Sequence, residues 1–423
     1  MVNKKSILIL TADAGFGHRS AANAIAAALE LEHSAECVYK ILNPIEDKRA
    51  PFFLRDSATD YDWLMRHSPE LYRFGWSATD KELPYYFVEG VLTVALYEIM
   101  QDIIKEYNPD AIVSTYAAYQ APLISYFTIN QYFVPLITVI TDLISVHRLW
   151  FSLGVDLCLV PTIEVQNLAI ANKIAKDKIH ITGIPVSPKL KSRKISKRNL
   201  RMALDWDPAL PTFLAVGSRR VGQLIESLNV LNHFGEPLQV VAVAGGDEAL
   251  YEELKKIEWH VPSHIYKFVE NMPDYMRAAD AIICKAGGLI VTESLACGLP
   301  MLLIDIIPGQ EEGNRDYVVQ NGAGEMIESP IQMLETLSHW MANKGKLLRE
   351  RTSNARRCGK PNAASDAVDL IWREATRGPV NKQGLHGIGR LPLIDLLTRN
   401  HIPWQVKQND SIEVTESDID SKG

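Results

Sequence analysis

The stretch from Lys285 to Asn314 constrains the fold of this chain more narrowly than any other. A predicted apolar strand, Ala281 to Cys284, ends just before it, and Gly287 and Gly288 stand where that strand gives way to a helix. A proline stops the helix, and Met301 to Ile307 is then apolar and strand-like. This order predicts a strand–helix–strand unit of a parallel sheet, whose ligands bind beyond the carboxyl ends of the strands.

The polar residues of this stretch are compatible with a nucleotide-sugar site. Glycines such as Gly287 and Gly288 let main-chain N–H groups approach a ligand closely, and a helix N-terminus favours an anion. Glu293, near the first turn of the helix, can accept hydrogen bonds from a sugar diol. The polar loop Gly309 to Asn314 follows the next strand. An ordinary strand–helix–strand unit with common caps explains the same spacing about equally well, since a pair of glycines is a weak motif.

Composition limits the class of protein. At 423 residues the chain is long enough for two domains, and its 47% hydrophobic and 22% charged residues are typical of a globular protein. A formal net charge of −7 argues against nucleic acid as a main partner. No apolar run reaches the roughly 18 residues that a membrane span requires, and residues 1–6 contain no secretory signal. The five cysteines are scattered without zinc-binding spacing, so we expect reduced thiols in a cytosolic protein and no metal site.

The first part of the chain begins with a strand, a loop and a helix. Ile7 to Leu10 is a short buried strand, and the loop Thr11 to His18 contains two glycines. The next segment, Ser20 to Leu31, is an alanine-rich helix. This order is typical of the first half of a doubly wound α/β domain.

Polar and aromatic residues follow a later strand, Leu136 to Ile140. Thr141 and Asp142 close this strand, and His147 and Trp150 lie in the loop after it. They therefore fall at the carboxyl end of the sheet, where ligands of such domains bind.

Residues 43–100 interrupt the alternation of strands and helices and are rich in aromatic side chains. They include Phe52, Phe53, Trp63 and Trp76. Two explanations remain open for them: insertion helices that pack on their own core, or an apolar acceptor site or membrane-contacting surface.

The alternation of elements predicts two domains and a tail. The first domain covers residues 1–190, with 43–100 as an insertion. The basic stretch Lys189 to Arg201 follows two prolines and is the expected linker. A second α/β domain covers residues 191–380. Residues 381–423 form an extension and an acidic tail that we expect to be disordered.

Several motifs together resemble the monogalactosyldiacylglycerol synthase branch of glycosyltransferase family 28, which includes the bacterial processive diacylglycerol glucosyltransferases. They are Ile7 to Ala27, Val139 to Asp142 with His147 and Trp150, Val160 to Val165, Gly183 to Pro188, and Phe268 to Ala323. The sequence departs from this pattern at Val216 to Gly222, where relatives have a run of glycines. This departure leaves the identity of the donor open.

The resemblance implies a fold, an activity and a location. The fold is α/β of the GT-B type, with two Rossmann-like doubly wound domains facing across a cleft. The activity is an inverting transfer of hexose from a UDP-hexose to a lipid alcohol, and we expect diacylglycerol as the acceptor. No cofactor is needed, since the UDP-sugar is a substrate. The enzyme is expected in the cytoplasm, peripheral on the inner face of the cell membrane.

The resemblance also implies roles for individual residues. His18 is the candidate general base, and Asp142 would orient it or the acceptor. The expected acceptor-binding residues are Gly17, His147 and Trp150. The expected donor-binding residues are Gly217, Ser218, Arg219, Val269, Gly287, Gly288, Glu293, Gln310, Glu311 and Asn314. Main-chain N–H groups at Gly217, Ser218 and the later glycine pair would stabilise the leaving UDP.

Two other classes of function compete with lipid glycosylation. One is another GT-B enzyme, either a UDP-sugar epimerase or a transferase with a soluble acceptor. The other is a non-catalytic protein that binds lipid or nucleotide sugar. His18, Glu293 and Gln310 argue against the non-catalytic class, and the aromatic segment 43–100 favours a lipid acceptor.

Overall fold

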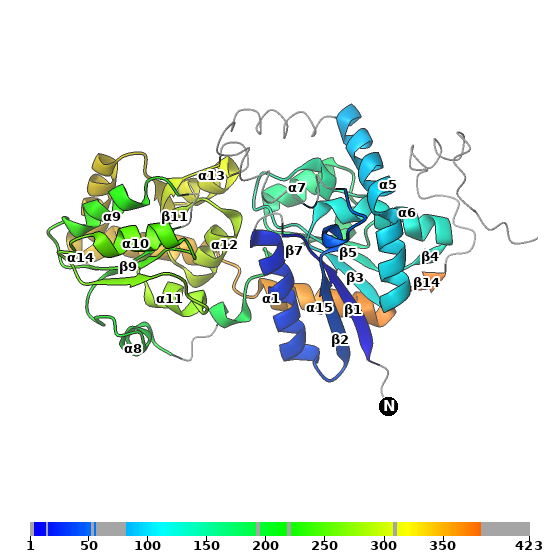
Figure 1. The fold of residues 1–423 in the computed structure, drawn as a ribbon, viewed down its shortest axis with the longest axis horizontal. Coiled ribbons are helices and arrows are strands. Elements are labelled where there is room, and N and C mark those ends of the chain that lie inside the picture. The colour runs from blue at the N-terminus through cyan, green and yellow to red at the C-terminus, as the bar shows by residue number, and fades with distance from the viewer. Residues whose placement is uncertain are drawn as a thin grey trace, which may run out of the picture. The chain divides into compact units, whose positions relative to one another are not determined.

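The structure, a computed structural model, describes residues 4–13, 16–51, 55, 82–191, 195–217, 221–307 and 311–381. Within these residues the strands form two six-stranded sheets and one two-stranded pair. Figure 1 shows both larger sheets with the helices that pack on them. All strand pairs in the two larger sheets are parallel.

The first sheet has the strand order β2-β1-β3-β5-β6-β7. Its strands are β1 (Lys5–Leu10), β2 (Cys37–Leu42), β3 (Ala111–Ser114), β5 (Leu136–Val139), β6 (Leu157–Val160) and β7 (Ile179–Ile181). The helices of this part are α1 (Phe16–His33), α5 (Glu82–Tyr107), α6 (Gln120–Asn130) and α7 (Ile163–Ala171). The central strands are short apolar runs, since a parallel sheet is buried on both faces.

The second sheet has the order β10-β9-β8-β11-β12-β13. Its strands are β8 (Thr212–Val216), β9 (Gln239–Val243), β10 (Ser263–Tyr266), β11 (Ala281–Lys285), β12 (Met301–Asp305) and β13 (Gly324–Met326). The helices are α8 (Lys197–Ala203), α9 (Leu224–Asn232), α10 (Glu248–Lys256), α11 (Met272–Ala278), α12 (Gly288–Cys297), α13 (Glu312–Gln320) and α14 (Pro330–Cys358).

Each sheet has one position where the chain reverses its direction of travel across the strands. In the first sheet this position lies between β1 and β3, and in the second it lies between β8 and β11. The loops that leave such neighbouring strands run to opposite faces and open a crevice at the carboxyl ends, where ligands bind. These two positions therefore identify where the sites of each half should be sought.

The last helix of the described chain, α15 (Ala363–Arg377), corrects the predicted domain boundary. The sequence assigned it to the second domain, 191–380. Its apolar face instead packs in the core of the first sheet, beside α1, through Ala364, Val368 and Ile371. Figure 1 shows α15 next to α1. A short pair of strands, β4 (Tyr132–Phe133) and β14 (Val380–Asn381), fastens the following residues to the same half.

The basic linker is partly fixed to the second half of the chain. Arg201 on α8 is only 5% exposed and donates hydrogen bonds to the carbonyl oxygens of Ala278 and Leu210. Its guanidinium also pairs with Asp280, as does the ammonium group of Lys197. Arg201 and Lys197 therefore anchor α8 to the second half of the chain, and their charges are already paired with Asp280.

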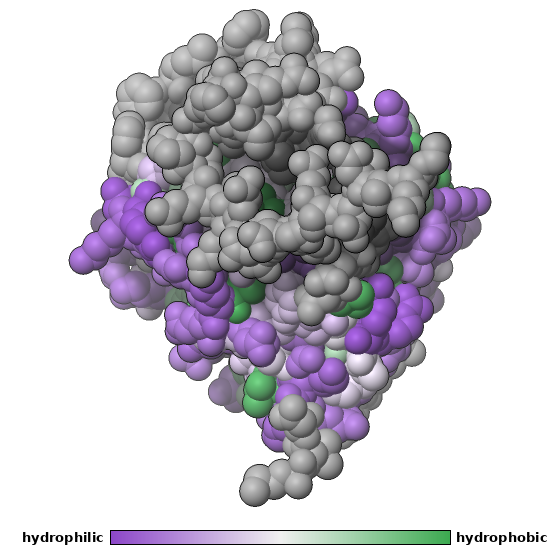
Figure 2. Space-filling model, turned by 90° about the vertical axis from the view of Figure 1, so that its right-hand side faces the viewer, coloured by the Kyte–Doolittle hydropathy of each residue, from purple (hydrophilic) through white to green (hydrophobic). Residues whose placement is uncertain are grey.

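One face of the described surface shows no broad apolar area. On the face in Figure 2, the described residues are mostly hydrophilic, and the apolar ones form small separate patches. None of the helices in the described ranges is both long enough and apolar enough to cross a bilayer. The aromatic residues Phe52, Phe53, Trp63 and Trp76, like the tail beyond residue 381, lie outside the described residues.

Candidate active site

His18 lies in the first turn of α1 and not in a loop, because α1 begins at Phe16, one turn earlier than the sequence predicted. Its imidazole Nδ1 is 2.7 Å from the hydroxyl Oγ1 of Thr141, which lies two residues after the end of β5. The hydroxyl of Thr115, just after β3, donates to the His18 carbonyl oxygen at 3.1 Å. His18 is thus held at the crevice between β1 and β3.

The surroundings of His18 keep its ring neutral. Burial lowers the pKa of His18 from 6.5 to about 4, although a hydrogen bond with the Thr115 main chain acts in the opposite direction. The ring of Tyr116 meets it edge-on at 5.1 Å between centroids, and the ring of Trp150 lies at 6.0 Å. A neutral imidazole can accept a proton, which is the state that a general base requires.

Asp142 lies in the same cluster with a different partner from the one expected. Its carboxylate oxygen Oδ2 accepts a 2.7 Å hydrogen bond from the indole nitrogen of Trp150. Burial raises the pKa of Asp142 to about 6, and the bond from Trp150 opposes this rise. The His18 ring is contacted by Thr141 instead. Thr141 belongs to one of the motifs described above. Nothing in the sequence indicated that its hydroxyl, and not the neighbouring Asp142 carboxylate, would contact His18.

His147 shapes the loop that carries Trp150. Its ring nitrogen Nδ1 accepts a hydrogen bond from the main-chain N–H of Leu149, at the start of the short helix η3 (Arg148–Trp150). The side chain is buried at 8% exposure. This geometry makes His147 a support for Trp150, whereas the predicted contact with an acceptor stays a prediction.

The end of β8 differs from the predicted phosphate loop. The main-chain N–H of Gly217 donates to the carbonyl oxygen of Val243 at 2.8 Å, so it is not free for a ligand. A side chain at this position would lie about 2.5 Å from the methyl groups of Leu224 and Leu250, which explains the glycine. Ser218 and Arg219 lie outside the described residues.

A glycine turn leads into the N-terminus of α12. Gly287 is the N-cap residue and, as a glycine, provides no side-chain cap; among the described residues no other side chain bonds to the N–H groups of the first turn. Asn314 stabilises the turn from α13 by donating a 3.0 Å hydrogen bond to the Ala286 carbonyl oxygen. A Cβ atom on Gly288 would lie 3.6 Å from the carbonyl oxygen of Thr141. Thr141 therefore lies against both the imidazole of His18 and the N-terminal end of α12.

The remaining predicted donor residues lie around this turn. Glu293 is on α12, and burial raises its pKa to about 7. Val269 lies beyond the end of β10, in the turn before α11, and packs partly on the core. Glu311 forms a 2.8 Å ion pair with Lys285, and its other oxygen accepts from the N–H of Ile307. With both oxygens engaged, Glu311 is better placed to position Lys285 than to bind the predicted hexose, and Gln310 lies outside the described residues.

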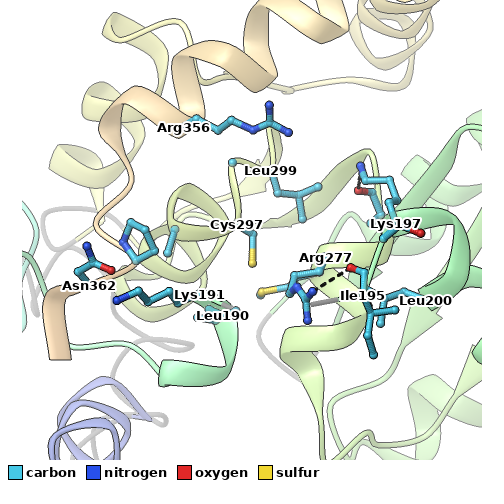
Figure 3. Close-up of a pocket in the computed structure, with 16 residues that line it drawn as sticks. Leu190, Lys191, Ile195, Lys197, Leu200, Arg277, Cys297, Leu299, Arg356 and Asn362 are labelled. Carbon is cyan, nitrogen blue, oxygen red and sulfur yellow. Dashed lines mark hydrogen bonds between the residues drawn. The ribbon is translucent and has the colours of Figure 1, made fainter. Parts of the chain in front are cut away.

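A separate cavity of about 700 Å³ lies away from these residues. Figure 3 shows it between the linker and helices α11, α12 and α14. Its lining includes Leu190, Lys191, Lys197, Arg277, Cys297 and Arg356. None of the predicted catalytic, donor or acceptor residues lines it, so this cavity and the candidate active site are different places.

Two family models match the chain. The model of monogalactosyldiacylglycerol synthase matches residues 18–186, and the model of the glycosyltransferase family 28 C-terminal domain matches residues 213–371. The chain is 32% identical over 385 residues to a probable monogalactosyldiacylglycerol synthase 2 of Oryza sativa subsp. indica, covering 87% of this chain and 80% of that one. This chain belongs to the monogalactosyldiacylglycerol synthase family. Monogalactosyldiacylglycerol synthase 2 of Arabidopsis thaliana is 31% identical, with 89% of this chain and 82% of that one covered.

Solved structures agree on the fold of this family member. MurG of Acinetobacter baumannii superposes with a TM-score of 0.56 at 14% identity, covering 88% of this chain and 100% of that one. A calicheamicin glycosyltransferase gives 0.54 at 14% identity, with coverages of 89% and 99%. A UDP-GlcNAc 2-epimerase of Neisseria meningitidis, solved with UDP-GlcNAc, gives 0.55 at 14% identity, with coverages of 87% and 100%. The predicted two-domain α/β architecture of the GT-B type is confirmed.

Proposed function

We propose that this protein is an inverting glycosyltransferase that moves a hexose from a UDP-sugar to diacylglycerol. The observation that carries the proposal is the position of Thr141. Its hydroxyl contacts the neutral imidazole of His18, and its carbonyl oxygen faces the open N-terminus of α12 at Gly288. A candidate base and a candidate diphosphate site thus meet at one residue. Membership of the monogalactosyldiacylglycerol synthase family supports this choice of substrates.

In the proposed reaction, the acceptor hydroxyl oxygen attacks the anomeric carbon of the hexose. His18 takes the hydroxyl proton as the new carbon–oxygen bond forms. The bond from the anomeric carbon to the UDP oxygen breaks, and UDP leaves with the electron pair. The N–H groups at the start of α12 stabilise the charge that develops on UDP. A single displacement of this kind inverts the anomeric configuration.

The location at the membrane is part of the same proposal. Diacylglycerol stays in the bilayer, so the enzyme has to approach the cytoplasmic face of the membrane as a peripheral protein. Phe52, Phe53 and Trp63 are the proposed apolar anchors, because aromatic residues favour the bilayer interface. A UDP-sugar epimerase shares the fold, but the family match and the proton-accepting state of His18 favour transfer.

The proposal is tested by incubating the protein with diacylglycerol-containing vesicles and UDP-galactose, UDP-glucose or UDP-N-acetylglucosamine in turn. Lipid analysis should show a glycosylated diacylglycerol with at least one donor, and the His18→Ala protein serves as the matched control. Co-sedimentation with the same vesicles should increase with anionic lipid and decrease with salt. An epimerised nucleotide sugar without any glycolipid would refute the proposal in favour of the epimerase function.

A further inference from the structure

A nearly buried ion pair lies at the reversal point of the second sheet. Lys285 is the last residue of β11, which is paired with β8 at this point. The register of β11 shifts between Cys284 and Lys285, and such a shift redirects the side chain that follows it. The ammonium nitrogen of Lys285 is 2.8 Å from Oε1 of Glu311, and the two side chains are 14% and 8% exposed. A buried charge of this kind needs a specific reason, because desolvation is costly.

The pair lies beside the open N-terminus of α12. A Cβ atom on Gly287 would be 3.5 Å from Oε1 of Glu311 and 4.0 Å from Cε of Lys285. The start of a helix carries partial positive charge and disfavours a cation, so Lys285 gains nothing from α12 by itself. The Glu311 carboxylate already supplies one negative charge here, and a phosphate that enters beside it would be attracted by both the helix and the ammonium group.

The contacts of Glu311 hold Lys285 in place without using all of its donors. Oε2 of Glu311 accepts a 2.8 Å hydrogen bond from the N–H of Ile307, which fixes the carboxylate. A lysine ammonium group has three N–H donors, and the contact with Glu311 uses one of them. Among the described residues Lys285 has no second ion-pair partner, which leaves two donors for a ligand beside Gly287.

We propose that Lys285 binds the diphosphate of the sugar nucleotide and that Glu311 positions it. This assignment rests on the proposed function, since it assumes a UDP-sugar donor. The leaving UDP gains one negative charge when its bond to the hexose breaks, and a fixed ammonium group stabilises that charge. Lys285 is therefore expected to affect turnover as well as affinity. The competing interpretation is a structural ion pair that only connects β11 to α13.

Calorimetric titration with uridine and with UDP separates these two interpretations, because only UDP carries a diphosphate. Lys285→Met should weaken UDP binding by about 10- to 100-fold, the effect of losing one hydrogen bond to a charged group. Uridine binding should change by less than about twofold, and Lys285→Arg should recover most of the UDP affinity. Steady-state kinetics should show a decrease in kcat for Lys285→Met in addition to any change in KM.

Two further variants control for folding. Lys285→Met leaves Glu311 as an unpaired buried charge, which can unfold a protein. The double variant Lys285→Met/Glu311→Gln removes both charges and should retain the fold and the selective loss of UDP affinity. The matched control is Lys255→Met on α10, because Lys255 also pairs with a glutamate, Glu252, but lies at the surface. It should bind UDP like the wild-type protein.

The outcomes distinguish this assignment from the function on which it rests. Unchanged UDP affinity in the double variant would overturn the role of Lys285, and so would an equal loss of uridine and UDP binding. A wild-type protein that binds UDP with the expected selectivity but makes no glycolipid would leave Lys285 as a diphosphate ligand and refute the lipid acceptor. A wild-type protein that binds no UDP would refute both proposals.

Discussion

The assignment of His18 as the general base can be tested from the pH dependence of the reaction, because Asp142, the other predicted catalytic residue, has a well-separated pKa. Burial lowers the pKa of His18 to about 4 and raises that of Asp142 to about 6. Both side chains lie in the cluster around Trp150. Because the pKa of His18 falls from 6.5 to about 4, burial destabilises its imidazolium form by roughly 3 kcal/mol relative to the neutral ring.

These values give different rates at pH 5. If His18 is the base, about 90% of the free enzyme carries it unprotonated at pH 5, so kcat/KM stays close to its value at pH 7. If Asp142 is the base, only about 10% is unprotonated at pH 5, and kcat/KM falls roughly tenfold. His18→Ala should in addition reduce turnover by about 10²-fold or more. Asp142→Asn should then retain more activity than His18→Ala.

The assay measures glycolipid formation between pH 4.5 and 8 in neutral detergent micelles, which avoid the altered surface pH of anionic vesicles. Glu293 would distort the profile, because its own pKa of about 7 affects donor binding. The profile is therefore measured in the Glu293→Gln background, in which this position does not titrate. A half-maximal kcat/KM near pH 6, together with an active His18→Ala protein, would refute the assignment of His18.

Four further predictions concern donor binding and stability. Uridine binding should tighten as pH rises through about 7, because the ionised Glu293 carboxylate, unlike its protonated form, accepts hydrogen bonds from both ribose hydroxyls. Calorimetry on Glu293→Gln should show uridine affinity that does not change with pH. The same raised pKa means that the folded state holds a proton between pH 4.5 and about 7, so this residue's contribution to the free energy of unfolding should decrease as pH rises across that window. Trp150→Phe removes the hydrogen bond to buried Asp142, so urea unfolding should show a loss of about 1–3 kcal/mol and the pKa of Asp142 should rise further; an unchanged midpoint would contradict the bond. Gly359→Ala places a Cβ atom 2.0 Å from a main-chain oxygen of α12 and should lower the free energy of unfolding by about 2 kcal/mol or more. In Gly222→Ala the new Cβ meets no atom of the described residues within 4 Å, so the free energy of unfolding should stay within about 0.5 kcal/mol of wild type.

The sequence by itself determined the elements whose signals are local. The predicted strands Ala281 to Cys284 and Leu136 to Ile140 match β11 and β5 to within one residue. Apolar runs, caps and glycines act over a few residues, so they can be interpreted without knowledge of the tertiary fold. The combined motifs were also sufficient to identify the family and the fold.

Only the tertiary structure decided which groups meet. Thr141 contacts His18 across 123 positions of sequence, and nothing near either residue predicts that contact. The sequence placed α15 with the second domain, and only the tertiary structure shows that its apolar face is buried against the first sheet. The pairing of Glu311 with Lys285 likewise depends on how α13 follows β12. Partners and pKa values depend on burial and on atoms brought together from distant segments, and these arise only when the sheets and helices have packed.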